Sequence, residues 1–338
     1  MKKIVTLLTL LFFANLGFAQ NDKVISLIKE GIKHHDAGAY EKAIASYKQA
    51  LEIEPNSSLA NYEISLSYMR NKDYKNAIKY SDKVLKLKEA KHELAAYMVK
   101  GSALDLLGET SKSIKLFKKA IKKYRSHLLN YNLALNYFKL KDLDNAEKYA
   151  IQAIEIKTDH ASSHFMLGNL HSMKGNKVQA VLAIYYALFL EPNSERAKGA
   201  YGLLKANIAS GVKQEKDNPN KINLSVSGKG EFAPAELMLS MLAANRLTEK
   251  NKDKTEQELF RENTASFFAV MGELKENNKQ KKNIWWEFYT PFFYKLSKSD
   301  HMEAFCHFIS LSSDEVSLKW LKSSDDKVKA FAEWLKKQ

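Results

Sequence analysis

The sequence predicts an all-α protein in which pairs of helices repeat five times, followed by a smaller, mainly helical domain. The first observation is a series of small residues that returns about every 34 residues. A second series lies seven residues after the first. Because seven residues span two helical turns, both series lie on one face of a helix. They are Ala43, Ala77, Ser113, Ala146 and Ala180, followed by Ala50, Val84, Ala120, Ala153 and Ala187.

A third series lies upstream of the other two and keeps the same step. It consists of Gly31, Ser65, Gly101, Ala134, Gly168 and Gly202. Small residues at such positions let neighbouring helices approach closely. A period of this size is typical of stacked helix pairs, none of which can bury its apolar face alone.

These positions resemble the tetratricopeptide repeat family. The first unit carries Gly31, the loop at 37–40, Ala43, Tyr47, Ala50 and Pro55. The fifth unit carries Leu167, Gly168, Gly175, Asn176, Ala180, Ala187 and Pro192. Units two to four match less closely, because Ser81 and Ala150 replace the aromatic residue and other residues replace the closing proline.

The resemblance defines units at residues 24–57, 58–91, 94–127, 127–160 and 161–194, with a closing helix at 195–210. It implies two antiparallel helices in each unit. It also implies that residues 20–211 form a right-handed superhelix with a capping helix.

The N-terminus reads as a secretory signal peptide over residues 1–19. Lys2 and Lys3 precede an apolar run at 4–13, and small residues around Phe18 end it, so cleavage is expected before Gln20. An N-terminal membrane anchor is the alternative, although the run is shorter than the ~20 residues of a spanning helix. Because the residue directly after the cleavage point is Gln20 and not cysteine, lipid attachment there is excluded. We therefore expect a periplasmic or secreted protein with no transmembrane segment in the mature chain.

The net charge of +14 belongs mainly to the repeats. Lysines follow a step of three or four residues in two second helices, which the family places on the outer, convex face. They are Lys75, Lys79, Lys83 and Lys86, and Lys112, Lys115, Lys119 and Lys122. A solvated helix face is the preferred interpretation over contact with phospholipid, and nucleic acid is not expected as a partner.

First helices line the inner groove in this family, so this surface is the candidate binding site. The predicted groove residues are Tyr62, Leu66, Met69, Met98, Tyr131, Leu135, Phe138, Phe165 and Asn169. Ile28, Ile32, Glu63 and Val99 stand where relatives that clamp chaperone tails carry basic groups and asparagine, which excludes that ligand. The groove is expected to bury side chains of an extended or helical segment, with Tyr131 and Phe138 as anchors. Packing between neighbouring helices is the alternative role for these side chains.

The composition changes after Gly211. Residues 212–221 read as a linker, and alternation at 222–226 predicts a short strand, with a hairpin as an option. Residues 222–338 are otherwise helical. Their densest aromatic run, 284–294, contains Pro291 and is interpreted as core broken by that proline rather than as a ligand platform.

The sequence shows no motif for catalysis, and no cofactor or metal is predicted. His164 and His171 lack a third ligand at metal spacing, and the single cysteine, Cys306, reads as a buried thiol. Three hypotheses remain. The preferred one is a non-enzymatic scaffold that binds a protein or peptide of the cell envelope. The others are self-association in which the C-terminal domain fills the groove, and an enzyme with an unrecognised C-terminal catalytic domain.

Overall fold

The structure, a computed structural model, describes residues 20–217, 221–226, 230–277 and 282–338. The predicted signal peptide lies outside these residues. The all-α prediction is confirmed, because helix follows helix along the described chain and its sheet has only two short strands. The chain divides into two compact units, residues 1–142 and residues 143–338. The boundary between the units thus falls inside the fourth repeat, away from the segment at 212–221 that the sequence predicts as a linker.

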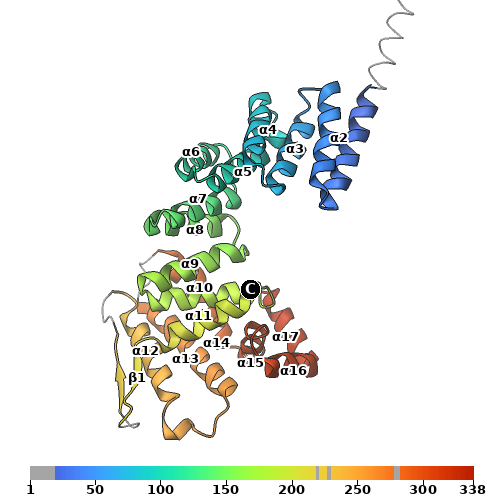
Figure 1. Cartoon of the computed structure of the whole chain (residues 1–338). Coiled ribbons are helices and arrows are strands. Elements are labelled where there is room, and N and C mark those ends of the chain that lie inside the picture. Colours follow the sequence, from blue (N-terminus) through green and yellow to red (C-terminus); the bar gives the residue numbers. More distant parts are fainter. Residues whose placement is uncertain (1–19, 218–220, 227–229, 278–281) are drawn as a thin grey trace, which may run out of the picture. The chain divides into compact units, whose positions relative to one another are not determined.

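In the first unit the predicted repeats form successive helix pairs joined by tight turns (Figure 1). Residues 20–36 are helical and pair with the helix that follows. The other helices are α2 (Tyr40–Ile53), α3 (Ser58–Arg70), α4 (Tyr74–Leu87), α5 (Ala90–Leu106), α6 (Thr110–Ala120) and α7 (His127–Lys139). Consecutive helices pack together, and α3 also contacts α5, which contacts α7. The first helices of successive repeats are therefore neighbours.

The turns within the helix pairs share one backbone feature, a residue with positive φ. Glycine supplies it at Gly38 and Gly108, with φ of 74° and 81°. Lysine supplies it at Lys72 and Lys141, with φ of 61° and 63°. A residue in the left-handed backbone conformation ends a helix at its own position, and glycine adopts this conformation without steric cost. The repeat thus fixes the turn geometry, while the residue at the turn is allowed to vary.

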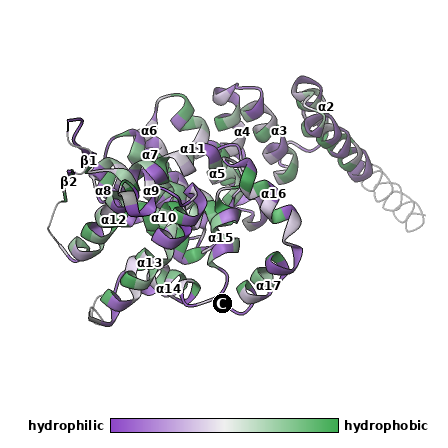
Figure 2. Ribbon diagram, turned by 90° about the horizontal axis from the view of Figure 1, so that it is seen from below, coloured by the Kyte–Doolittle hydropathy of each residue, from purple (hydrophilic) through white to green (hydrophobic). Residues whose placement is uncertain are grey.

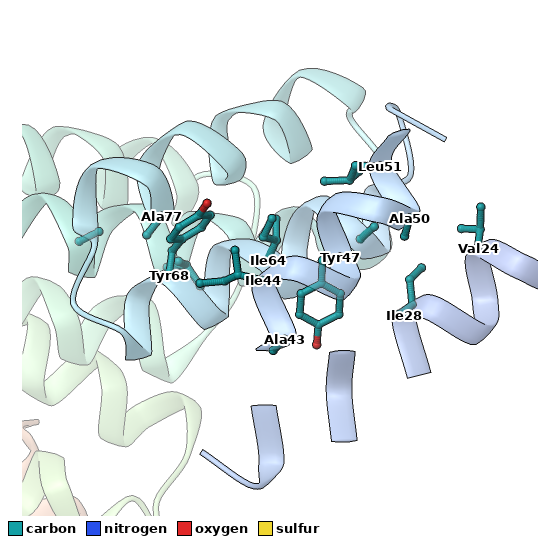
Figure 3. Close-up of a cluster of buried hydrophobic side chains, with 13 residues drawn as sticks. Val24, Ile28, Ala43, Ile44, Tyr47, Ala50, Leu51, Ile64, Tyr68 and Ala77 are labelled. Atoms are coloured by element: carbon teal, nitrogen blue, oxygen red, sulfur yellow. The ribbon is translucent and has the colours of Figure 1, made fainter. Parts of the chain in front are cut away.

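The core of the first unit lies within the helix pairs and continues from one pair to the next. Figure 3 shows Tyr47 and Leu51 of α2 grouped with Ile28 of the preceding helix and with Ile64 and Tyr68 of α3. The helices here carry both hydrophobic and hydrophilic residues along their length, as on α2 in Figure 2. Such amphipathic helices pack through one face, so each pair leaves its opposite side to its neighbours or to solvent.

Facing positions in the helix pairs match in size. An ideal Cβ on Gly31 would lie 2.4 Å from the Tyr47 ring, and one on Gly101 would lie 2.1 Å from the Phe117 ring. At the equivalent positions of repeats two and four, Ser65 precedes Ser81 and Ala134 precedes Ala150. A large residue on the second helix thus requires glycine on the first, whereas a small one permits a small side chain there.

The second unit begins with the rest of the repeats. These helices are α8 (Leu143–Ile156), α9 (Ala161–Lys174), α10 (Lys177–Leu190) and α11 (Ala197–Ala209). The C-terminal helices are α12 (Ala233–Asn245), α13 (Glu256–Asn277), α14 (Thr290–Ser297), α15 (Met302–Ile309), α16 (Glu315–Ser323) and α17 (Asp325–Leu335). A 3₁₀ turn at Glu249–Asn251 and a π-helix at Trp285–Tyr289 complete the unit. The π-helix runs directly into α14, which has Pro291 in its first turn, so the helical hydrogen-bonding pattern changes just before this proline and the predicted break into two helices does not occur.

Helix α10 forms the centre of this unit. It contacts α9 and α11 of the repeat array, and α12, α15 and the π-helix of the C-terminal segment. Its sequence is apolar on all sides, which is typical of a helix enclosed by protein. The C-terminal helices therefore cover the second helix of the fifth repeat.

Aromatic rings contribute to this contact and to the core beside it. Tyr186 packs against Phe288 and Phe292, with ring centroids 4.9 and 5.2 Å apart. Phe293 stacks on Phe268 of α13 at 4.3 Å. The aromatic run is core, as the sequence predicts, and this core is continuous with the fifth repeat.

A short hairpin lies between the repeats and the C-terminal helices. β1 (Val212–Gln214) pairs antiparallel with β2 (Ile222–Leu224), with Val212 opposite Leu224. The predicted strand is present, but the linker predicted at 212–221 begins with its partner strand, which is formed by residues 212–214. Among the described residues, none of the helices combines the length and the apolar character needed to cross a membrane.

A candidate binding face on the first helices

The candidate site is built on the first helices of repeats two, three and four, which lie in the first unit. Helix α5 touches both α3 and α7. In a stack of similar repeats, equivalent residues of neighbouring first helices point to the same side. A residue pattern that returns on α3 and α7 therefore forms one surface, which we call the first-helix face.

On α3 this face carries four apolar residues at helical spacing, Leu59, Tyr62, Leu66 and Met69. All four are half-buried and pack at their base against the core of the first unit. Steps of three and four residues place them in one stripe along the helix. Part of each side chain remains at the surface.

On α7 the same spacing returns in Leu128, Tyr131, Leu135 and Phe138. Leu128 is 41% exposed and Leu135 is 36% exposed, which is high for leucine. Tyr131 and Phe138 are half-buried, and the ammonium of Lys141 lies 5.8 Å from the Phe138 ring. Exposed apolar residues scattered singly are normal, but a contiguous stripe of them indicates an interaction surface.

Helix α5, between them, presents a more polar stripe. Met98 is half-buried, and the equivalent positions beyond it are Ser102 and Asp105. The Lys139 ammonium of α7 donates to Asp105 Oδ1 at 3.1 Å. An exposed ion pair of this kind adds little stability, but it places fixed charges at one end of the apolar stripes.

Burial perturbs the titratable groups at the α3 end of the face. The Tyr62 ring stacks on His92 with centroids 5.9 Å apart, and His92 Nδ1 lies 3.0 Å from Ser58 Oγ. Burial raises the pKa of Tyr62 and of Glu63 and lowers the pKa of His92. Burial is the largest cause of each shift, because it disfavours the charged form of the group.

The structure brings seven of the nine predicted groove residues onto this face and places the other two in the second unit. Phe165 is only 6% exposed, because the Arg196 guanidinium lies over its ring at 4.4 Å. Asn169 is exposed, and its Nδ2 donates to the Phe165 carbonyl oxygen. On α9 the stripe is polar apart from Phe165, which differs from α3 and α7.

Other residues of the face depart from the sequence interpretation. Ile28 is 5% exposed and belongs to the core, as does Val99, so these two positions are closed to any ligand. Leu59 and Leu128 were missed, although each lies three residues before a predicted member of its stripe. His92 was also missed, because its stacking on Tyr62 joins two repeats and leaves no local pattern.

Comparisons with known proteins agree with the repeat pattern. A tetratricopeptide repeat model matches residues 59–91, 94–125 and 128–160, and a second TPR repeat model matches residues 31–72. A TPR repeat-containing protein of Methanocaldococcus jannaschii is 26% identical over 157 residues, which are 46% of this chain. The chain spans 27% of the length of that relative.

About half of the chain is also similar to several solved structures. MamA is 24% identical and matches with a TM-score of 0.44, covering 53% of this chain and 96% of the other. The pilF protein of Pseudomonas aeruginosa is 16% identical with a TM-score of 0.46, covering 56% and 90%. YrrB, described as a TPR protein with an unusual peptide-binding site, is 19% identical with a TM-score of 0.43, covering 56% and 97%.

Proposed function

Because tetratricopeptide repeat models match residues 31–91, 94–125 and 128–160, we propose that this chain is a non-enzymatic scaffold whose first-helix face binds a segment of another protein. Repeat arrays of this kind offer extended surfaces rather than enclosed reaction sites. The segment contributes apolar side chains that lie on α3 and α7.

One observation carries this proposal, the return of the same half-exposed apolar stripe on α3 and α7. Side chains buried only for packing would be fully covered, as Ile64 and Leu133 are on the same two helices. The stripe residues instead keep exposed area that a partner can remove from water. Tyr131 and Phe138 are the expected anchors, because partly buried aromatic rings lose little side-chain entropy on binding.

The polar end of the face limits the register of the bound segment. Asp105 and Lys139 offer both an acceptor and donors beside Ser102, so a polar group of the segment fits there better than an apolar one. We infer a segment whose apolar residues fall on the α3 and α7 stripes, with a polar residue between them.

We extend the proposal to export of the mature chain into the periplasm or out of the cell, supported by the signal-peptide pattern at residues 1–19. The partner would then be a protein of the cell envelope. Comparing the mass and N-terminal residue of the protein in cell fractions tests this. A chain that retains Met1 in the cytoplasmic fraction would contradict export.

Binding itself is tested by selecting peptides from a random display library on the purified protein. Their affinities are then measured by isothermal titration calorimetry. The Tyr131→Ala, Phe138→Ala variant should bind the selected peptides roughly 30-fold more weakly, as expected when two interface anchors are truncated. The circular dichroism spectrum should stay unchanged.

A matched control truncates two exposed apolar residues elsewhere. Val316→Ala with Leu318→Ala changes α16, where these side chains are 60% and 40% exposed. It should bind the peptides as the wild type does. Equal affinity of the wild type and the Tyr131→Ala, Phe138→Ala variant would exclude the first-helix face as the binding site.

A further inference from the structure

The second unit contains a cavity of about 390 Å³ that the repeat scaffold does not use. Its walls come mainly from α10, α11, α12 and α13, with Val212 of β1, so a repeat helix, the capping helix and two C-terminal helices surround it. Its size falls in the range of small-molecule sites, which are concave and mostly apolar with a few polar groups.

The deep wall of the cavity is apolar. Leu239, Leu259 and Phe267 are 3%, 6% and 1% exposed and line it together with Ala243. The polar atoms here already have partners, since the hydroxyls of Tyr185 and Thr264 lie 2.8 Å apart. An occupant of this end gains from burying apolar surface and is not required to supply a polar group.

The mouth of the cavity is charged and half-exposed. Glu256 Oε1 accepts from Lys205 Nζ at 3.3 Å and lies 3.2 Å from Arg246 Nη2. Among the residues that line the cavity, two cations thus share one carboxylate, which leaves a formal charge of +1 at the opening. Leu247 is 43% exposed at the same edge.

We propose that this cavity binds a single-chain amphiphile with one carboxylate, such as a fatty acid. The hydrocarbon chain of the amphiphile lies against Leu239, Leu259 and Phe267, and its carboxylate lies at the mouth beside Arg246 and Lys205. A monoanion balances the excess positive charge of the mouth. The planar guanidinium of Arg246 matches the two oxygens of a carboxylate.

Isothermal titration calorimetry of the purified protein with laurate below its micelle concentration tests this, beside dodecanol and dodecyltrimethylammonium. One laurate molecule should bind to each protein molecule. Dodecanol should bind about tenfold more weakly, since it lacks the charge-assisted contacts. The cationic amphiphile should show no binding. Failure of laurate to bind, or equal affinity for all three compounds, would overturn the proposal.

Variants test the apolar wall of the cavity and its charged mouth separately. Ala243→Phe fills the cavity and should abolish binding of laurate and dodecanol. Met241→Phe on the same helix, at a residue 52% exposed, should leave both unchanged. Arg246→Gln should weaken laurate about tenfold and leave dodecanol as it was.

The fold of each variant can be checked by tryptophan fluorescence, since all four tryptophans lie in this unit. If Ala243→Phe does not fold, Leu247→Asp takes its place, because it adds a negative charge at the exposed rim and should reduce laurate binding. Laurate binding that survives in a folded Ala243→Phe or in Leu247→Asp would contradict the assignment.

Discussion

The second helices of repeats two and five hold equivalent positions in their repeats but lie in opposite surroundings. When Ala77 of α4 is aligned with Ala180 of α10, the exposed residues Lys75, Lys79, Lys83 and Lys86 align with Val178, Leu182, Tyr186 and Phe189. Val178 and Leu182 are 1% and 0% exposed, and Tyr186 and Phe189 are half-buried among aromatic rings. The repeat pattern fixes only the face that packs within the array. The residues of the opposite face are charged where solvent surrounds the helix, as on α4, and apolar where another part of the chain covers it, as on α10.

The largest expected effect comes from giving α10 the character of α4. Leu182→Lys places an ammonium where the side chain is 0% exposed, so the second unit should lose more than about 4 kcal/mol of unfolding free energy. Urea unfolding followed by tryptophan fluorescence measures this, because all four tryptophans lie in this unit.

Lys79→Leu is the matched reverse change at the equivalent position of α4, where the side chain is exposed. It should alter the unfolding free energy by less than about 0.5 kcal/mol. If Leu182→Lys had an effect as small as this, the cover over α10 would not be part of the stable fold.

This comparison also shows what the sequence predicts and where it fails. The small residues of the three series fix the helix pairs, their register and their turns, because every repeat satisfies the same local packing. The enclosure of α10 is also present in the sequence, since an apolar residue replaces each lysine of α4. From the sequence, a solvated outer face was assigned to the two lysine-rich second helices, and the enclosure of α10 was not predicted.

The candidate site was predicted less fully for a physical reason. The stripes on α3 and α7 follow helical spacing, and spacing is visible in sequence. The cover of Arg196 over Phe165 and the stacking of His92 on Tyr62 are contacts between repeats. The spacing of residues along the sequence does not show which side chains meet across such an interface. The cavity in the second unit is likewise lined by residues spread from Tyr185 to Phe267, so no local pattern marks it.

A second prediction concerns pH and the covered side of the fifth repeat. His164 is 0% exposed. Its Nε2 donates to the Thr158 carbonyl oxygen at 2.8 Å, and its Nδ1 accepts from the Tyr289 hydroxyl at 2.5 Å. Burial is the main cause that lowers the pKa of His164 to about 4. The neutral ring is therefore the folded form.

Since the unfolded chain protonates this histidine near pH 6.5, the unfolded state takes up the proton first as pH falls. Stability is retained above pH 6.5 and should decline between pH 6.5 and about 4, by about 3 kcal/mol in total. Unfolding by urea across this range, read by tryptophan fluorescence, should show a shallower slope for His164→Gln than for the wild type. Parallel curves for the two proteins would exclude His164 as the source.

A third prediction tests whether the size match between facing residues holds the first unit together. In Gly101→Ala the new Cβ would lie 2.1 Å from the Phe117 ring, so the helices must separate or the ring must move. We expect a loss of about 1–3 kcal/mol, which is typical of overpacking. Far-UV circular dichroism during urea unfolding reports it.

Phe117→Leu provides the coupling control. By itself it leaves a cavity, but combined with Gly101→Ala the two changes should offset each other by about 1 kcal/mol or more, because the residues are in contact. Additive losses would mean that the glycine and the ring do not constrain one another. The matching sizes of Ser65 and Ser81 in repeat two would then be coincidental.

The smallest effect on stability is expected when α4 receives the apolar residues of α10. Lys79→Leu with Lys83→Tyr should leave the unfolding free energy within about 0.5 kcal/mol of the wild type, since both lysines are exposed. The variant should nevertheless self-associate, because it creates an apolar patch at positions that are exposed in α4. Size-exclusion chromatography with light scattering measures the mass, with Lys79→Gln and Lys83→Gln as the control that removes charge alone. A variant that stays monomeric where the glutamine control does would show that the lysines of α4 are not needed to keep this helix in solvent. In that case the C-terminal helices that cover α10 would be needed for the stability of the second unit and not to prevent self-association.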